Sequence, residues 1–214
     1  MLSTKLIKSV SFIVVGVAMA LSSQAYAVSQ GDWLLRFGAV SVNPNDSSGQ
    51  VGTISGSSVS VDSSQGIFLN VTYMLRDNIG LEVLAATPFS HDVTATGSIS
   101  GLGKIAEVKQ LPPTISVQYH FMPKSDFRPY VGAGINYTTF FNIKTTGGTV
   151  TSMSLDDSWG LAAQVGFDKD ISKDWFINAD LRYIKIKTTA TTNVGNVDVT
   201  IDPWVISLGV GTRF

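Results

Sequence analysis

The sequence contains two histidines, His91 and His120, and their neighbours decide whether either could do acid–base chemistry. Ser90, His91 and Asp92 place the three residue types of a hydrolase triad side by side. Triad geometry is assembled across a fold, however, and adjacent residues of one segment rarely meet in it. We interpret the run as a chance cluster and His120 as a hydrogen-bonded interior residue. The sequence therefore predicts a protein that is not an enzyme and has no catalytic residues.

Metal, cofactor and nucleic-acid sites have no matching pattern either. The chain contains no cysteine, which excludes thiolate metal sites and disulfide frameworks. Neither metal-ligand spacing nor a phosphate-cradling glycine loop occurs, because Gly132-Ala133-Gly134 lies in a strand-like segment where small residues relieve crowding. The formal net charge is −1, without basic blocks. We expect no metal, no cofactor and no nucleic-acid partner.

Polar and charged residues recur at alternate positions of otherwise apolar segments, which places them on the inner face of a closed sheet. They are Arg36, Arg76, Glu82, Gln118, His120, Arg128, Asn136, Gln164, Asp168, Asn178, Asp180, Arg182 and Arg213. Their charges are mixed in sign, which favours an interior filled by ion pairs over a charge-selective pore. We predict a lumen plug, with an open polar pore as the alternative. The residues expected to form it are Arg36, Glu82, His120, Arg128, Asp168, Asp180, Arg182 and Arg213.

The segments that carry these residues are about ten residues long, as a tilted membrane-spanning strand requires. In residues 67–75 the odd positions are apolar, and Asn70 and Thr72 fall between them. Such segments lie at about 32–42, 67–75, 79–89, 114–121, 131–138, 158–168, 175–183 and 206–214. Tight connections at 76–78, 122–126 and 170–174 alternate with long ones at 43–65, 90–111, 142–157 and 188–198. A soluble β-sandwich also alternates, so the connections and the N-terminus must decide between the two.

The N-terminus has the pattern of a secretory signal peptide. Two lysines precede an apolar run at residues 10–21 and a small-residue stop at Ala25-Tyr26-Ala27. The apolar run is too short to cross a bilayer as a helix. We predict cleavage after Ala27, which leaves residues 28–214 as the mature domain. Charged residues make up 14% of the chain, against about 25% in soluble domains.

These features predict an all-β fold, an eight-stranded antiparallel transmembrane β-barrel with short periplasmic turns and long extracellular loops. Closure pairs every backbone group, which the bilayer core requires. Aromatic residues at the strand ends agree with this, because amphipathic rings settle at the level of the lipid headgroups. The expected periplasmic girdle holds Trp33, Phe121, Phe127, Trp175 and Phe214. The expected outer girdle holds Phe89, Phe140, Phe141, Trp159 and Trp204.

The long loops are more apolar than loops in water need to be. Several apolar residues alternate with Ser or Thr, so we expect strands to continue beyond the membrane. One interpretation is an outer pocket for a small hydrophobic ligand, and ordinary packing of the barrel rim is the alternative. The residues expected to line the pocket are Val51, Ile54, Val59, Val61, Ile99, Leu102 and Leu155. Other apolar loop residues are Val93, Ile105, Val150 and Met153.

Distinctive segments occur at Asp77-Asn78-Ile79-Gly80, residues 84–89, Leu111-Pro112-Pro113-Thr114, residues 128–137, residues 157–160, Asp202-Pro203-Trp204 and Arg213-Phe214. In sequence and order they closely resemble the outer membrane protein W (OmpW) family. The resemblance covers nearly the whole mature chain. It implies a barrel in the outer membrane of a Gram-negative bacterium that lets small hydrophobic molecules pass passively. The implied route runs through an apolar outer pocket to a lateral exit into the bilayer.

The same resemblance implies the partners of the protein. They are the lipid of the outer membrane, small hydrophobic solutes and the barrel-assembly machinery, for which Phe214 is the expected assembly signal. A structural or surface-interaction barrel without transport activity is the alternative function.

Overall fold

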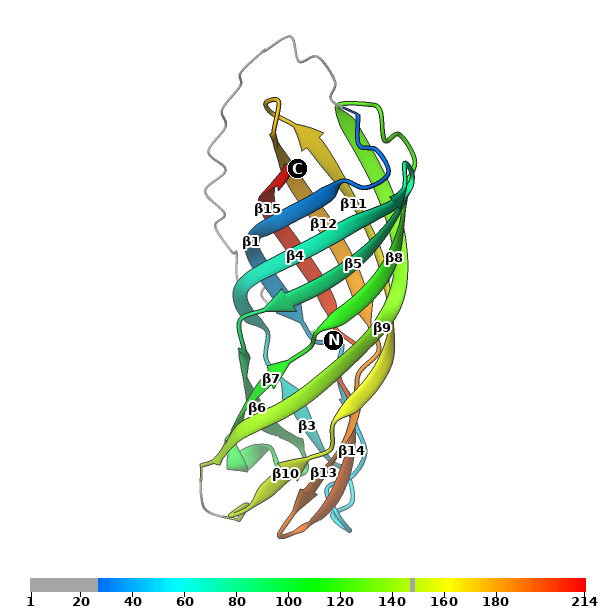
Figure 1. Cartoon of the computed structure of the whole chain (residues 1–214). Coiled ribbons are helices and arrows are strands. Elements are labelled where there is room, and N and C mark those ends of the chain that lie inside the picture. The colour runs from blue at the N-terminus through cyan, green and yellow to red at the C-terminus, as the bar shows by residue number, and fades with distance from the viewer. Residues whose placement is uncertain (1–26, 147–148) are drawn as a thin grey trace, which may run out of the picture.

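The computed structural model describes residues 27–146 and 149–214, so all but the last residue of the expected signal peptide lie outside it. The described chain is almost entirely antiparallel sheet (Figure 1). Eight strands close into a barrel in the order β11, β12, β15, β1, β4, β5, β8 and β9, and β9 pairs with β11 to complete the ring. The predicted fold class is confirmed.

Each predicted segment coincides with a barrel strand, although the strand predicted at 131–138 runs from Phe127 to Thr145 and extends into the connection expected at 142–157. The barrel strands are β1 (Trp33–Asn43), β4 (Ser64–Arg76), β5 (Ile79–Ala86), β8 (Thr114–His120), β9 (Phe127–Thr145), β11 (Ser158–Asp170), β12 (Trp175–Ile184) and β15 (Trp204–Arg213). Short turns join β4 to β5, β8 to β9 and β11 to β12, where the sequence predicts them. Among the described residues, no helix is long and apolar enough to cross a membrane.

The long connections at the opposite end form two further sheets. β3 (Ser57–Val61), β6 (Phe89–Gly97) and β7 (Lys104–Leu111) continue from the end of β9, with the 3-10 turn η1 (Ser100–Leu102) between β6 and β7. β2 (Ser47–Ser48), β10 (Met153–Leu155), β13 (Lys187–Thr192) and β14 (Gly195–Thr200) form the other sheet. Figure 1 shows both at the lower end of the barrel, and together we call them the outer extension. The prediction that strands continue past the barrel is confirmed.

The predicted strand at 79–89 is interrupted. β5 ends at Ala86 and β6 begins at Phe89, because Pro88 has no N–H to donate to a neighbouring strand. The amide of Thr87 still donates to the carbonyl of Ile67 in β4, at 2.8 Å. The interruption therefore affects the edge of this segment that faces β8, and not the edge that pairs with β4.

On that facing side, Pro112 and Pro113 separate β7 from β8. Pairing across this seam stops at Leu84 in β5 and resumes at Phe89 in β6. Between these points, residues 85–88 face residues 111–113 without forming a ladder. We call this stretch the wall gap.

Burial alternates along the barrel strands as the sequence predicts. In β8, Ile115 and Val117 are exposed, whereas Ser116 and Gln118 are buried. The outward face of the barrel is therefore apolar and the inward face polar, which suits a surface covered by lipid.

The aromatic girdles depart from the expected sets at the outer end. The five periplasmic rings are exposed, and so are Trp159 and Trp204. Phe89, however, is only 2% exposed, and Phe140 faces a pocket inside the outer extension. Their assignment to a girdle is wrong, because strands that run past the membrane enclose an apolar interior of their own.

Candidate functional site

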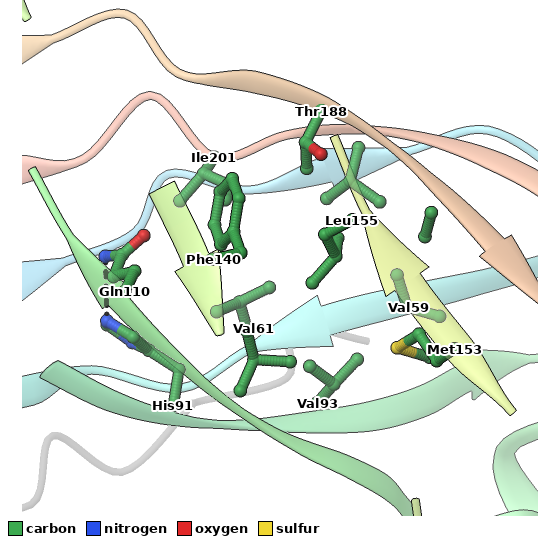
Figure 2. Close-up of a pocket in the computed structure, with 13 residues that line it drawn as sticks. Val59, Val61, His91, Val93, Gln110, Phe140, Met153, Leu155, Thr188 and Ile201 are labelled. Atoms are coloured by element: carbon green, nitrogen blue, oxygen red, sulfur yellow. Dashed lines mark hydrogen bonds between the residues drawn. The ribbon is translucent and has the colours of Figure 1, made fainter. Parts of the chain in front are cut away.

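An apolar pocket lies between the two sheets of the outer extension (Figure 2). Its cavity volume is about 50 Å³. Its walls are formed by Val59, Val61, His91, Val93, Val108, Gln110, Phe140, Met153, Leu155, Thr188, Ala190, Val199 and Ile201.

The residues expected to line a pocket separate into three groups. Val59, Val61 and Leu155 line it. Val51 is buried in the adjoining apolar core, and Ile99 packs against that core. Ile54 and Leu102 are exposed and lie away from the pocket.

The sequence analysis missed several residues that line the pocket. Two pairs of them show the alternation of a β-strand: Thr188 with Ala190, and Val199 with Ile201. The alternation could have identified them, but the high threonine content makes the segment resemble a polar loop. His91 and Gln110 gave no signal, because strand pairing rather than sequence proximity brings them together.

The polar groups of the pocket lie at one side of it. The Nδ1 atom of His91 lies 2.7 Å from the carbonyl oxygen of Asp62, and its Nε2 lies 2.9 Å from Nε2 of Gln110. A carbonyl oxygen only accepts, so Nδ1 carries the proton and Nε2 accepts from the Gln110 amide. Burial lowers the pKa of His91, which favours the neutral ring over the protonated one.

The neighbours of His91 face the other way, because side chains alternate along β6. The Ser90 hydroxyl donates to Oε1 of Glu107 at 3.2 Å, and Asp92 pairs with Lys104 at 2.6 Å. Ser90, His91 and Asp92 therefore do not form a triad with one another.

Between the pocket and the middle of the barrel, an apolar core fills the part of the barrel next to the outer extension. Its large members include Phe68, Leu84, Phe89 and Ile184. The fit around Phe89 is close, since a Cβ added at Gly66 would lie 2.9 Å from its ring. Because Phe89 directly follows the wall gap, apolar side chains connect the pocket with this gap.

A polar layer lies on the side of the apolar core that faces away from the pocket, and it centres on Glu82, which is fully buried. Its Oε1 accepts from Arg182 at 2.8 Å and from Gln164 at 3.1 Å. Its Oε2 accepts from Gln118 at 2.5 Å and from Asn70. Four strands therefore converge on one carboxylate.

A second polar layer centres on Arg36 and Asp168, both fully buried. Nε and Nη2 of Arg36 donate to the two carboxylate oxygens of Asp168 at 2.9 and 2.8 Å. The Nη1 atom of Arg36 donates to Thr72 at 2.7 Å and to Asn70 at 3.2 Å. Such bidentate, charge-assisted pairs are strong and hold the two side chains in a fixed relative orientation.

The other expected plug residues also face the lumen. Asp180 accepts from the Tyr130 hydroxyl at 3.1 Å, and the ring of His120 lies against that of Tyr130, with centroids 5.3 Å apart. Arg128 and Arg213 both contact Asp170, at 2.6 and 3.0 Å.

For two residues near strand ends, the position predicted from the sequence is wrong. The sequence places Asp170 in a turn, yet it is buried at the end of β11. Arg76, expected in the lumen, is exposed. An irregularity in strand pairing between Met74 and Arg76 shifts its register.

The end of the barrel with the short turns is closed by a small apolar cluster. Val28, Leu34, Met74 and Phe176 form it, each with no exposed surface. The amide of Val28 donates to the carbonyl of Pro123 at 2.8 Å, which holds the start of the described chain across this end. The barrel axis is thus filled by two polar layers and this cluster.

Comparisons with known proteins agree with this architecture. A family model described as the OmpW family matches residues 29–214. Outer membrane protein W of Vibrio cholerae serotype O1 is 49% identical over 209 residues, which cover 92% of this chain and 96% of the relative. Outer membrane protein AlkL of Ectopseudomonas oleovorans is 31% identical over 218 residues, which cover 96% and 94%. The crystal structure of outer membrane protein OprG from Pseudomonas aeruginosa superposes with a TM-score of 0.84 at 39% identity, over 88% of this chain and 98% of the other.

Proposed function

The chain belongs to the OmpW family of bacterial outer-membrane barrels, and from this premise we propose that it lets small hydrophobic molecules cross the outer membrane passively. The solute enters the pocket of the outer extension and leaves sideways through the wall gap into the bilayer. The observation that carries the proposal is the continuity of apolar side chains from the pocket through the core to Phe89.

An exit along the barrel axis is unfavourable for an apolar solute. It would have to displace the hydrogen-bonded layers around Glu82 and Asp168, and buried polar groups left without partners cost about 1–3 kcal/mol each. It would then meet the closed cluster around Val28 and Phe176. The wall gap requires no such loss, because no strand ladder has to be broken there.

The pocket also favours ligand binding over simple rim packing. A rim that serves only to pack would bring its apolar side chains into contact, whereas these leave empty volume between two sheets. The bottom of the pocket continues into the core, so a solute there stays out of water.

Proteoliposomes that take up a fluorescent apolar probe test the proposal. Val93 lines the pocket, and Val93→Trp is expected to fill it and return uptake to the rate of empty liposomes. Val83→Trp is the matched control, because Val83 is exposed on the outer face of β5 and should not affect uptake. Equal uptake by the wild type, Val93→Trp and empty liposomes would contradict the proposal.

A second pair of variants tests the route. Gln118→Ala removes one donor to Glu82 and loosens the polar layer. We expect it to raise ion conductance in planar bilayers and to leave probe uptake unchanged. A rise in probe uptake that parallels the conductance would instead indicate passage along the axis.

We also propose that Phe214 is the assembly signal read by the barrel-assembly machinery. It is 73% exposed and lies at the closing seam of the barrel. Its amide and carbonyl both bond to Trp33 of β1. Replacement by Ser should lower the yield of assembled barrel in cells, with little effect on refolding of purified protein into detergent.

A further inference from the structure

The cavity in the outer extension is too small to hold an organic solute without a movement of its walls. Its volume is about 50 Å³, whereas pockets for such molecules have volumes of about 300–1,000 Å³. The two sheets of the outer extension must therefore separate before a solute can enter. Among the described residues, no strand ladder joins these sheets. They can part along either of the two seams where their edges meet, or at the distal tip, the end farthest from the barrel.

The distal tip is closed by apolar packing and by hydrogen bonds. The buried apolar side chains at this end are Val51, Ala95, Ile105 and Val197. Asn193, in the turn between β13 and β14, accepts from the amide of Thr151 and donates to the carbonyl of Thr149, each at 2.9 Å. A solute that entered at the tip would have to break both the packing and these bonds.

One seam, between β2 and β3, is closed by polar side chains. The amide of Val59 donates to Oγ of Ser48 at 2.8 Å. The amide of Val61, which lines the pocket and is half-buried, donates to Oδ2 of Asp46 at 3.0 Å. Since these side chains satisfy the free edge of β3, opening this seam would leave backbone donors without partners.

The other seam lies between β9 and β10, which diverge from a fork at Asp157 (Figure 1). β9 turns to pair with β7, whereas β10 pairs with β13. The carboxylate of Asp157 accepts from the Tyr137 hydroxyl and holds the fork. At the far end of the seam, the Thr145 hydroxyl donates to the carbonyl of Thr151 at 3.3 Å. Between these two points, none of the described residues of β10 hydrogen-bonds to β9.

The side chains along this second seam are apolar. Phe140 of β9 and Met153 and Leu155 of β10 line the pocket and are only half-buried (Figure 2). The fork lies at the level of the lipid headgroups, because the exposed ring of Trp159 lies against that of Tyr137, with centroids 4.8 Å apart. Opening the seam beside the fork thus breaks no hydrogen bond and presents an apolar surface next to the membrane.

From this comparison, and resting on the proposed function, we infer that the solute enters the pocket sideways between β9 and β10, beside the membrane surface, and not through the distal tip. Phe140, Met153 and Leu155 form the mouth. Asp157 at the fork and the bond from Thr145 to Thr151 set its two ends.

Reversible ties across the two seams test this inference, since the chain has no cysteine of its own. Continuing the register of Thr138 and Ser158 from the fork places Asn142 of β9 opposite Ser154 of β10. Both are exposed, and neither lines the pocket. In Asn142→Cys/Ser154→Cys, a short bifunctional thiol reagent therefore ties the strands together without filling the pocket.

The tie should bring uptake of a fluorescent apolar probe by proteoliposomes to the rate of empty liposomes, and reductant should restore it. Each variant is compared with itself before and after reduction, so an effect of the substitutions on folding cancels. Asn142 has a positive φ of 49°, which disfavours other residues. Lys144→Cys/Ser152→Cys, the next exposed pair along the same seam, therefore serves as a second variant.

Ser47→Cys/Ser60→Cys is the matched control, because the bonds from Val59 to Ser48 and from Val61 to Asp46 place these serines opposite each other across the first seam. Its tie should leave uptake unchanged. Uptake that neither tie affects, or that both stop equally, would overturn entry between β9 and β10 while the proposed function stands. Uptake by the untied wild type no faster than by empty liposomes would overturn the proposed function, and this inference with it.

Discussion

Loss of one buried cation should destabilise the barrel more than the loss of any surface ion pair. Arg36→Met keeps the length and apolar stem of the side chain but removes the guanidinium. Asp168 is then left charged with 0% exposure, and among the described residues only Asn178 remains as a close donor, at 2.9 Å. Removing one partner of a buried pair costs about 3–5 kcal/mol, and we expect the free energy of unfolding to fall by that amount.

A surface ion pair serves as the control, and a double variant tests whether the loss of stability comes from the unpaired charge. Lys169 pairs with Asp126 at the surface, with side chains 41% and 34% exposed, so Lys169→Met should cost no more than about 1 kcal/mol. Arg36→Met combined with Asp168→Leu removes both charges, and we expect it to regain most of the stability.

Urea-induced unfolding in lipid vesicles, followed by tryptophan fluorescence, gives these free energies. The reasoning predicts a large loss for Arg36→Met, a small one for Lys169→Met and partial recovery in the double variant. A loss in Arg36→Met no greater than in Lys169→Met would refute the view that Arg36 and Asp168 form a buried pair in which each charge depends on the other.

Three further predictions concern the outer half of the molecule. Phe89→Ala should lower the free energy of unfolding by about 3–5 kcal/mol in the same urea assay, because the ring is 2% exposed; a loss below about 1 kcal/mol would mean that water already enters the core. Gly66→Leu should cost about 1–3 kcal/mol by overpacking, since its Cβ would lie 2.7 Å from Thr87 Oγ1 and 2.9 Å from the Phe89 ring; wild-type stability would contradict this close fit. Burial lowers the pKa of His91 below its usual 6.5, so the unfolded chain gains its proton first as the pH falls. Stability should therefore decrease below about pH 6.5, and urea midpoints at pH 7.5 and 5.5 should differ less in His91→Leu.

Alternation alone predicts the barrel and most of its interior. Lipid outside and polar groups inside impose a period of two, so Arg36, Glu82, Asp168 and Arg182 were assignable to one face without coordinates. An irregularity in strand pairing, such as the one before Arg76, moves the following residue to the other face of the sheet. The alternation then assigns that residue to the wrong face.

The outer extension was harder to predict because its strands keep the same alternation beyond the membrane. Nothing in the local sequence marks where lipid gives way to a second apolar interior, and so Phe89 and Phe140 looked like girdle residues. The pairing of His91 with Gln110 depends on the register of β6 against β7, which the pattern of single residues does not specify.

Photolabelling with a diazirine-bearing apolar probe tests the proposed route most directly. The probe is added to proteoliposomes and its sites are mapped by mass spectrometry, with lipid-facing residues such as Ile115 as the positive control. The account predicts labelled inward residues in the pocket, at Val61 and Met153, and at the wall gap, with none at Asn70 or Gln118 in the polar layer. Labels in the polar layer, or a pocket without any, would contradict passage from the outer pocket to the bilayer.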